Sequence, residues 1–85
     1  MRSITLYSLP NCVQCGATKK WLDRAGVEYA TVMLNESPDD AAAIAELGYK
    51  QAPIVIVSNG DAETDIHWGG FNPDFLKKYC MEIAA

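Results

Sequence analysis

The sequence predicts a mixed α/β domain with the element order β-α-β-α-β-β-α, in which three helices pack against a four-stranded mixed sheet. Three observations support this prediction: an alternating strand that leads directly into a helix, two later helix starts that contain proline and an acid, and a continuous β-branched run. A β-α-β start requires a right-handed crossover and a parallel strand pair, and the last two strands add an antiparallel edge. The 85 residues suffice for one domain, residues 1–85, with one modest core.

The first strand and helix are predicted from two periodicities. Ile4 and Leu6 alternate with polar residues, which indicates a strand over residues 3–8. A helix is predicted from residue 13 to about residue 25, and Gly26 is expected to end it. Its recurring core-facing residues are Cys15, Thr18, Leu22 and Ala25.

The middle of the chain predicts a second strand and a second helix. The strand is expected over residues 28–34. Ser37 is a favourable N-cap, and Pro38 suits the first helical position. The helix is expected to reach residue 47, with Gly48 as its stop. Its expected core-facing residues are Ile44 and Leu47.

The remaining elements are a hairpin and a third helix. Residues 54–57 are continuously β-branched, which indicates a central strand buried on both faces. Asn59-Gly60 predicts a hairpin to an antiparallel strand at about residues 64–68. Asn72 and Pro73 then begin a helix that is expected to reach about residue 83. Its predicted apolar stripe comprises Phe75, Leu76, Tyr79, Cys80 and Ile83.

The composition limits the classes of partner and compartment. A net charge of −4 and a pI of about 4.7 disfavour nucleic acid and anionic membrane surfaces as partners. We expect no membrane helix and no signal peptide, because no apolar run has the required length or position. Three cysteines are too few for a disulfide-stapled secreted scaffold. A reduced, cytoplasmic protein is therefore expected.

The motif Cys12-Val13-Gln14-Cys15 falls where the first predicted strand passes into the first helix. Unpaired N–H groups and the positive end of the helix dipole lie there and stabilise a thiolate. Cys15 follows one turn later, within reach of a disulfide to Cys12. We therefore predict a redox dithiol in which Cys12 attacks a disulfide and Cys15 resolves the product. Buried structural thiols or half of a zinc site are the alternative interpretations.

Three separated motifs resemble those of one family, and the resemblance covers essentially the whole chain: LPNCVQC at residues 9–15, YKQAP at 49–53 and HWGGFNPD at 67–74. They resemble the NrdH-redoxins, which are glutaredoxin-like proteins of the thioredoxin fold. The resemblance implies a thioredoxin-like fold and a dithiol–disulfide oxidoreductase without a bound cofactor or metal. It further implies ribonucleotide reductase as electron acceptor and thioredoxin reductase as electron donor, and we expect a monomer. The departures from the family pattern are Gly69 for a serine, Asn72 for an arginine and Met33 for an acid.

The resemblance also implies which residues surround the dithiol. Ala52-Pro53 matches a cis-proline site that faces the dithiol in this fold. Trp68 and Phe71 have two interpretations, as core residues or as an apolar rim that docks a partner. Gln14 is expected to face solvent. The residues expected to contact substrate or partner are Val13, Gln14, Ala52, Pro53, Trp68, Gly69, Gly70 and Phe71, with Leu9 beside them.

Two other functions stay open. Glutathione-dependent glutaredoxins carry a lysine before the motif's proline and a Thr-Val-Pro loop, whereas this chain has Leu9 and Gln51-Ala52-Pro53. A metal-binding module would take four ligands, and the available set is Cys12, Cys15, His67 and Cys80. Cys80 lies roughly 10 Å along the third helix from Pro73, on its apolar stripe, which favours a buried inert thiol instead. A subunit-bridging iron–sulfur cluster would need Cys12 from each chain together with glutathione.

Overall fold

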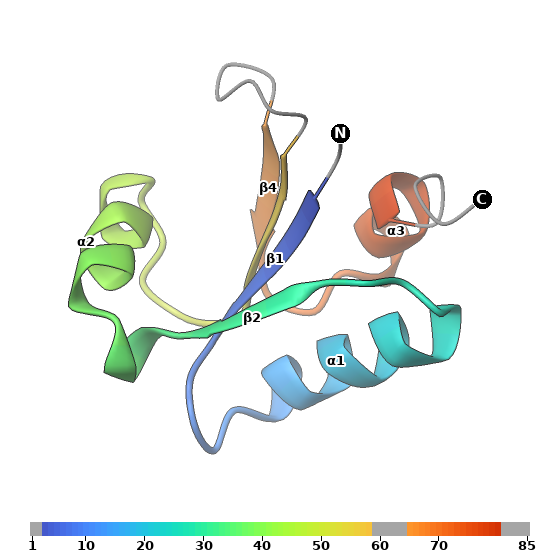
Figure 1. Cartoon of the computed structure of the whole chain (residues 1–85), viewed down its shortest axis with the longest axis horizontal. Helices are drawn as coiled ribbons and strands as arrows, with labels where there is room; N and C mark the ends of the chain where they lie inside the picture. The colour runs from blue at the N-terminus through green and yellow to red at the C-terminus, as the bar shows by residue number, and fades with distance from the viewer. Residues whose placement is uncertain (1–2, 59–64, 81–85) are drawn as a thin grey trace.

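The computed structural model describes residues 3–58 and 65–80, which build a mixed sheet with helices on both faces (Figure 1). The four strands are β1 (Ser3–Ser8), β2 (Ala30–Met33), β3 (Ile54–Ser58) and β4 (Ile66–Gly69), in the spatial order β2-β1-β3-β4. β1 pairs parallel with β2 and antiparallel with β3, which pairs antiparallel with β4. The predicted mixed four-stranded sheet is confirmed.

The helices divide between the two faces of this sheet. α1 (Val13–Ala25) and α3 (Pro73–Phe75) lie on one face, and α2 (Pro38–Glu46) lies on the other (Figure 1). α1 has the predicted bounds, and Gly26 ends it with a φ of 71°, a conformation that suits glycine. No helix in the described part of the chain is long and apolar enough to cross a membrane.

Several boundaries differ from the predictions. β2 is shorter than residues 28–34 because it is an edge strand that pairs only with the last four residues of β1, and Leu34 already begins the 3₁₀ turn η1 (Leu34–Glu36). After one α-helical turn, α3 continues as the π-helical segment η3 (Leu76–Cys80). α2 ends at Glu46, and β4 begins at Ile66. The Asn59-Gly60 turn, Thr64 and the predicted helix end at residue 83 lie outside the described residues.

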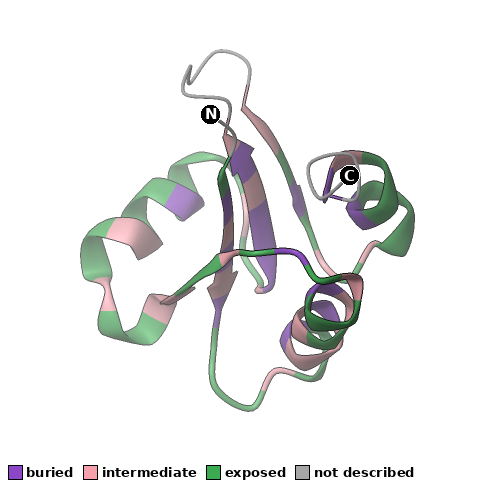
Figure 2. Cartoon of the chain, turned by 45° about the vertical axis from the view of Figure 1, so that its right-hand side comes forward, coloured by how far each residue is buried: buried purple, intermediate pink, exposed green. Residues whose placement is uncertain are grey.

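The main core lies between the sheet and the face that α1 and η3 cover, and Figure 2 shows buried residues along the central strands. Its buried members are Ile4, Leu6, Leu22, Val27, Val55, Val57, Trp68, Leu76 and Cys80. The predicted central position of β3 is confirmed, since β3 lies between β1 and β4 and Ile54, Val55 and Val57 are buried. Cys80 is also buried, as predicted.

Two predicted core residues are exposed instead. Leu47 is 48% exposed because it lies beyond the last helical residue of α2, as its C-cap, while Ile44 is buried as predicted. Phe75 is 40% exposed because the chain changes from α-helical to π-helical geometry directly after it, so a period of 3.6 residues does not hold there. Phe75 instead contacts Trp68 edge-to-face, with ring centroids 5.5 Å apart.

Candidate active site

Cys12 and Cys15 form a disulfide at the N-terminus of α1. Cys12 is the N-cap and Cys15 lies in the first helical turn, so their Cα atoms are 5.2 Å apart. Asn11 adopts a left-handed conformation, with a φ of 59°, just before the helix begins. Asparagine tolerates this conformation better than most residues, and the local sequence therefore suits the turn that presents Cys12.

The surroundings of the Cys12 sulfur favour a thiolate in the reduced protein. The backbone N–H of Cys15 points at Sγ of Cys12, with a nitrogen–sulfur distance of 3.2 Å. The sulfur also lies at the positive end of the α1 dipole. An N–H donor and the positive end of a helix dipole both stabilise negative charge on sulfur, so Cys12 has the surroundings of a nucleophile. Across the site, the Ala52 carbonyl oxygen lies 3.8 Å from Sγ of Cys12, and the Ala52-Pro53 bond is cis, as expected.

The two sulfurs differ in accessibility. Cys15 is 2% exposed, whereas Cys12 is partly exposed and its neighbour Val13 is 87% exposed. A disulfide of another protein can therefore reach Cys12 but not Cys15. This asymmetry supports the predicted order, in which Cys12 attacks and Cys15 resolves.

Gln14 connects the dithiol motif to the loop between β4 and α3. Its Oε1 accepts a hydrogen bond from the backbone N–H of Phe71 at 3.0 Å, while the N–H of Gly70 donates to the Pro53 carbonyl at 2.8 Å. Gly70 has a φ of 80°, and a Cβ there would meet Gln14 Oε1 at 3.2 Å. Gln14 is exposed, as expected, but its bond to Phe71 spans 57 residues and has no local sequence signal.

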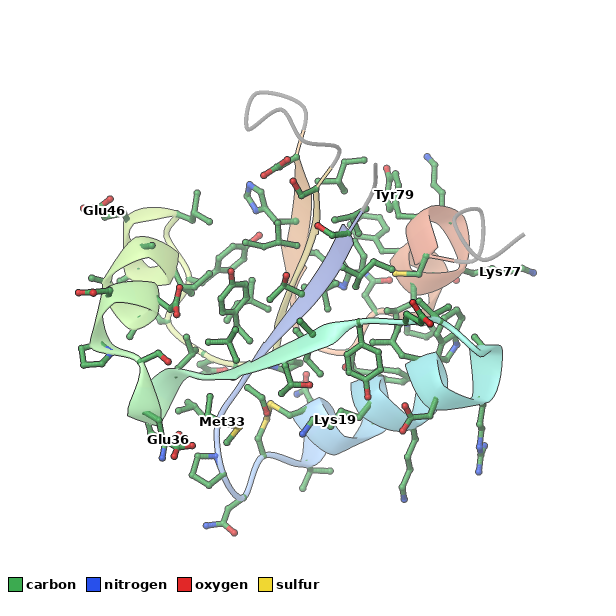
Figure 3. The ribbon with its side chains drawn as sticks, in the orientation of Figure 1. Lys19, Met33, Glu36, Glu46, Lys77 and Tyr79 are labelled. Carbon is green, nitrogen blue, oxygen red and sulfur yellow. A yellow bond between two sulfur atoms is a disulfide. The ribbon has the colours of Figure 1, made fainter. Side chains whose placement is uncertain are left out.

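A pocket of about 550 Å³ surrounds the disulfide, and its lining includes residues outside the motif that the sequence did not place beside the dithiol. Lys19 from α1 and Met33 from the end of β2 line this pocket, and both lie near the disulfide in Figure 3. Lys19 follows Cys15 by four residues, a spacing that places both on one side of a helix and could have indicated this position. Among the described residues, the pocket is lined by Ser8, Leu9, Pro10, Asn11, Cys12, Val13, Cys15, Gly16, Lys19 and Met33.

Comparisons with known proteins agree with this geometry. A family model described as Glutaredoxin matches residues 4–62. The glutaredoxin-like protein NrdH of Salmonella typhimurium is 37% identical over 76 residues, which cover 89% of this chain and 86% of that protein. NrdH of Escherichia coli K12 is 33% identical over 75 residues, covering 88% and 85% respectively. This chain belongs to the glutaredoxin family, as an NrdH-redoxin.

The solved structure of the NrdH-redoxin from Escherichia coli matches with a TM-score of 0.80 at 32% identity, covering 89% of this chain and 92% of that one. This match confirms the thioredoxin-like fold. Membership of the family makes this redoxin a thiol–disulfide oxidoreductase. Cys12 and Cys15 are the cysteine pair that the described part of the chain brings together.

The residues predicted to dock a partner of the redoxin are not equally accessible. Val13 and Gly69 are exposed, as are Leu9 at 37% and Phe71 at 39%. A second group is partly or fully covered: Ala52, Pro53 and Gly70. Trp68 is only 4% exposed, and its ring packs against Phe75 and Tyr79. Trp68 is therefore a core residue and not part of an exposed docking surface.

The four residues considered for a metal site lie in unlike surroundings. Cys80 is fully buried in the core, where burial raises its thiol pKa to about 11. His67 is exposed, with Nδ1 2.6 Å from the Tyr49 hydroxyl. Within residues 3–58 and 65–80, no group of three or more histidine, cysteine or acidic side chains is placed to hold a metal ion.

Proposed function

We propose that this redoxin passes electrons from thioredoxin reductase to ribonucleotide reductase, acting as a monomer in the cytoplasm. The observation that carries the proposal is apolar surface around the dithiol motif. Leu9 and Val13 line the pocket around the disulfide and are exposed, and so is Phe71, whose backbone is bonded to Gln14 of the motif. An exposed apolar surface of this kind suits contact with a protein rather than with a small polar thiol. The acceptor and the donor are assigned by resemblance to the NrdH-redoxins.

The reaction proceeds by two thiol–disulfide exchanges. The Cys12 thiolate attacks one sulfur of the acceptor disulfide, and the other acceptor sulfur leaves as a thiolate. Cys15 then loses its proton and attacks the Cys12 sulfur, which releases the second acceptor thiolate and forms the Cys12–Cys15 disulfide. Two electrons have then moved to the acceptor, and the reductase returns them by the reverse exchange.

Glutathione is disfavoured as the electron source by the residues around the dithiol. A glutathione site would place a cation at Leu9 and a threonine side chain near Gln51, and neither is present here. The net charge of −4 also repels an anionic tripeptide at long range. The solved Escherichia coli NrdH-redoxin is described as having a thioredoxin-like activity profile, which supports the same preference here.

Parallel kinetics with two reducing systems test the proposal. One system contains NADPH and thioredoxin reductase, and the other contains glutathione, glutathione reductase and NADPH. We expect efficient turnover of the redoxin only in the first, and turnover of ribonucleotide reductase when the redoxin is the sole dithiol donor. Faster turnover with glutathione would overturn the proposal and make the protein a glutathione-dependent glutaredoxin.

A further inference from the structure

A second groove, of about 480 Å³, lies between α1 and Phe71, separate from the pocket around the disulfide. The two share no described lining residue. The described residues that line the groove are Ala17, Lys20, Trp21, Arg24, Ala25 and Phe71. The exchange reaction described above uses none of the five α1 residues in this set.

The groove carries positive charge on an acidic protein. Lys20 and Arg24 lie one helical turn apart and both are exposed, and no acidic side chain is among the described lining residues. The sole acid of α1, Asp23, accepts a hydrogen bond from the Tyr29 hydroxyl at 3.0 Å. The chain as a whole has a net charge of −4, so this local reversal of sign favours a negatively charged occupant.

The groove is also apolar. Trp21 is half-buried, Phe71 is 39% exposed, and the alanines leave the surface between them open. Two aromatic rings offer area to an apolar side chain, while the cations beside them suit carboxylates. A segment of protein that carries both acidic and apolar side chains satisfies this combination.

Phe71 joins the groove to the dithiol. Its backbone N–H is held by Gln14, which lies between Cys12 and Cys15 in the motif. Arg24 follows Val13 by eleven helical positions, which is roughly 16 Å at about 1.5 Å per residue. An extended chain covers that distance in about five residues at about 3.3 Å each.

We propose that this groove binds an acidic, extended segment of the redoxin's protein partner, which carries an apolar residue and lies about five residues from the reacting cysteine. Lys20 and Arg24 pair with its carboxylates, and Trp21 and Phe71 contact its apolar side chain. The proposal rests on the proposed function only in taking the partner to be a disulfide-bearing protein.

A cysteine-free peptide tests the groove without any redox step. The probe is an acetylated eight-residue peptide of aspartate and glutamate with one central leucine, and its control has asparagine and glutamine in place of the acids. The indole N–H signals of the two tryptophans are followed by NMR during titration. We expect the acidic peptide to shift the Trp21 signal, while the buried Trp68 stays as an internal reference. An unmoved Trp21 signal, or equal binding of the neutral peptide, would overturn the proposal.

Two charge reversals locate the interaction. Lys20→Glu and Lys77→Glu change the net charge equally, but Lys77 is exposed on η3 and is not among the described groove residues. We expect Lys20→Glu to weaken peptide binding roughly fivefold, whereas Lys77→Glu leaves it nearly unchanged. Arg24→Glu repeats the reversal within the groove should Lys20→Glu disturb the fold. Equal weakening by Lys20→Glu and Lys77→Glu would show diffuse attraction rather than a groove, and would contradict the proposal.

Three further outcomes can be told apart. A Trp21 signal that moves on dilution without peptide would assign the groove to a second copy of the chain and overturn the proposal. If the peptide does not bind but the protein still prefers thioredoxin reductase, the proposed role of the groove is overturned and the proposed function is not. A preference for glutathione with the peptide still bound at Trp21 would overturn the proposed function alone.

Discussion

The side-chain oxygen of Gln14 accepts a hydrogen bond from the backbone N–H of Phe71 at 3.0 Å, which ties the dithiol motif to the loop before α3. Asn72 stands where NrdH-redoxins usually have arginine. Its Oδ1 accepts a hydrogen bond from the Phe75 N–H at 3.1 Å and so caps α3. The loop therefore keeps hydrogen-bonded order without the arginine. The hydrogen bond that Gln14 accepts from Phe71 joins this loop to the Cys-x-x-Cys motif.

Replacing Gln14 tests this connection. Gln14→Ala removes the acceptor of the Phe71 N–H and should lower the free energy of unfolding by about 0.5–1 kcal/mol, since the bond lies at the surface. Amide exchange at Phe71 should become faster. Gln14→Glu keeps an acceptor oxygen and serves as the control, with exchange close to that of the wild type. Unchanged exchange at Phe71 in Gln14→Ala would show that the hydrogen bond does not order the loop.

The cysteine variants test the order of attack. Cys12→Ser should abolish disulfide reduction because the accessible nucleophile is lost. Cys15→Ser should accumulate a mixed disulfide with the substrate, because attack by Cys12 survives and resolution does not. Mass spectrometry after exposure to a disulfide substrate measures both outcomes. If Cys12→Ser formed the adduct and Cys15→Ser did not, the two roles would be reversed.

Cys80 should be structural. It is fully buried in the core, so Cys80→Ala should keep full turnover and lose on the order of 1 kcal/mol of stability. Alkylation of the reduced native protein should label Cys12 rapidly and Cys80 slowly, because a buried neutral thiol is a poor nucleophile. Labelling of Cys80 as fast as Cys12 would contradict its burial and point to an accessible thiol.

The same residue should make stability depend on alkaline pH. Burial raises the pKa of Cys80 from 9.0 to about 11, so the unfolded chain releases this proton at lower pH than the folded one. The neutral buried thiol contributes about 2–3 kcal/mol to the free energy of unfolding. This contribution is fully present below about pH 9 and is lost as the pH rises towards about 11. Chemical denaturation across this range should show a steeper decline in the wild type than in Cys80→Ala. Three tyrosines with raised pKa, Tyr7, Tyr29 and Tyr49, are present in both proteins, so the difference isolates Cys80.

The sequence predicted those parts of the molecule that depend on neighbouring residues. The bounds of α1, its Gly26 cap and the position of Cys12 at the helix start follow from spacing and local backbone preference, and the structure confirms them. The bond from Gln14 to Phe71 joins residues far apart in the chain, which no periodicity reveals. Trp68 could not be assigned from the sequence, because its burial depends on packing against η3. The π-helical geometry of η3 likewise overrode the 3.6-residue period that placed Phe75 in the core.

Two phenylalanines of nearly equal exposure provide a matched test of partner docking. Phe71 is 39% exposed and its backbone is bonded to Gln14 beside the dithiol, whereas Phe75 is 40% exposed and packs against Trp68 and Tyr79. Both substitutions by alanine remove the same apolar area from the surface. Phe71→Ala should raise the KM for thioredoxin reductase roughly fivefold to tenfold, because an exposed interface aromatic contributes about 1–1.4 kcal/mol to docking. Phe75→Ala should leave this KM nearly unchanged.

Reactivity toward a small disulfide separates docking from chemistry in these variants. Neither phenylalanine side chain is among the residues that line the dithiol pocket, so both variants should reduce a small aromatic disulfide at the wild-type rate. Thermal unfolding monitors the fold, and Phe75→Ala should be the less stable of the two because it loses ring contacts with both Trp68 and Tyr79. An equal rise in KM in the two variants would show that it comes from a loss of fold stability and not from a lost docking contact. A rise confined to Phe75→Ala would place the docking surface at α3 instead of the dithiol loop.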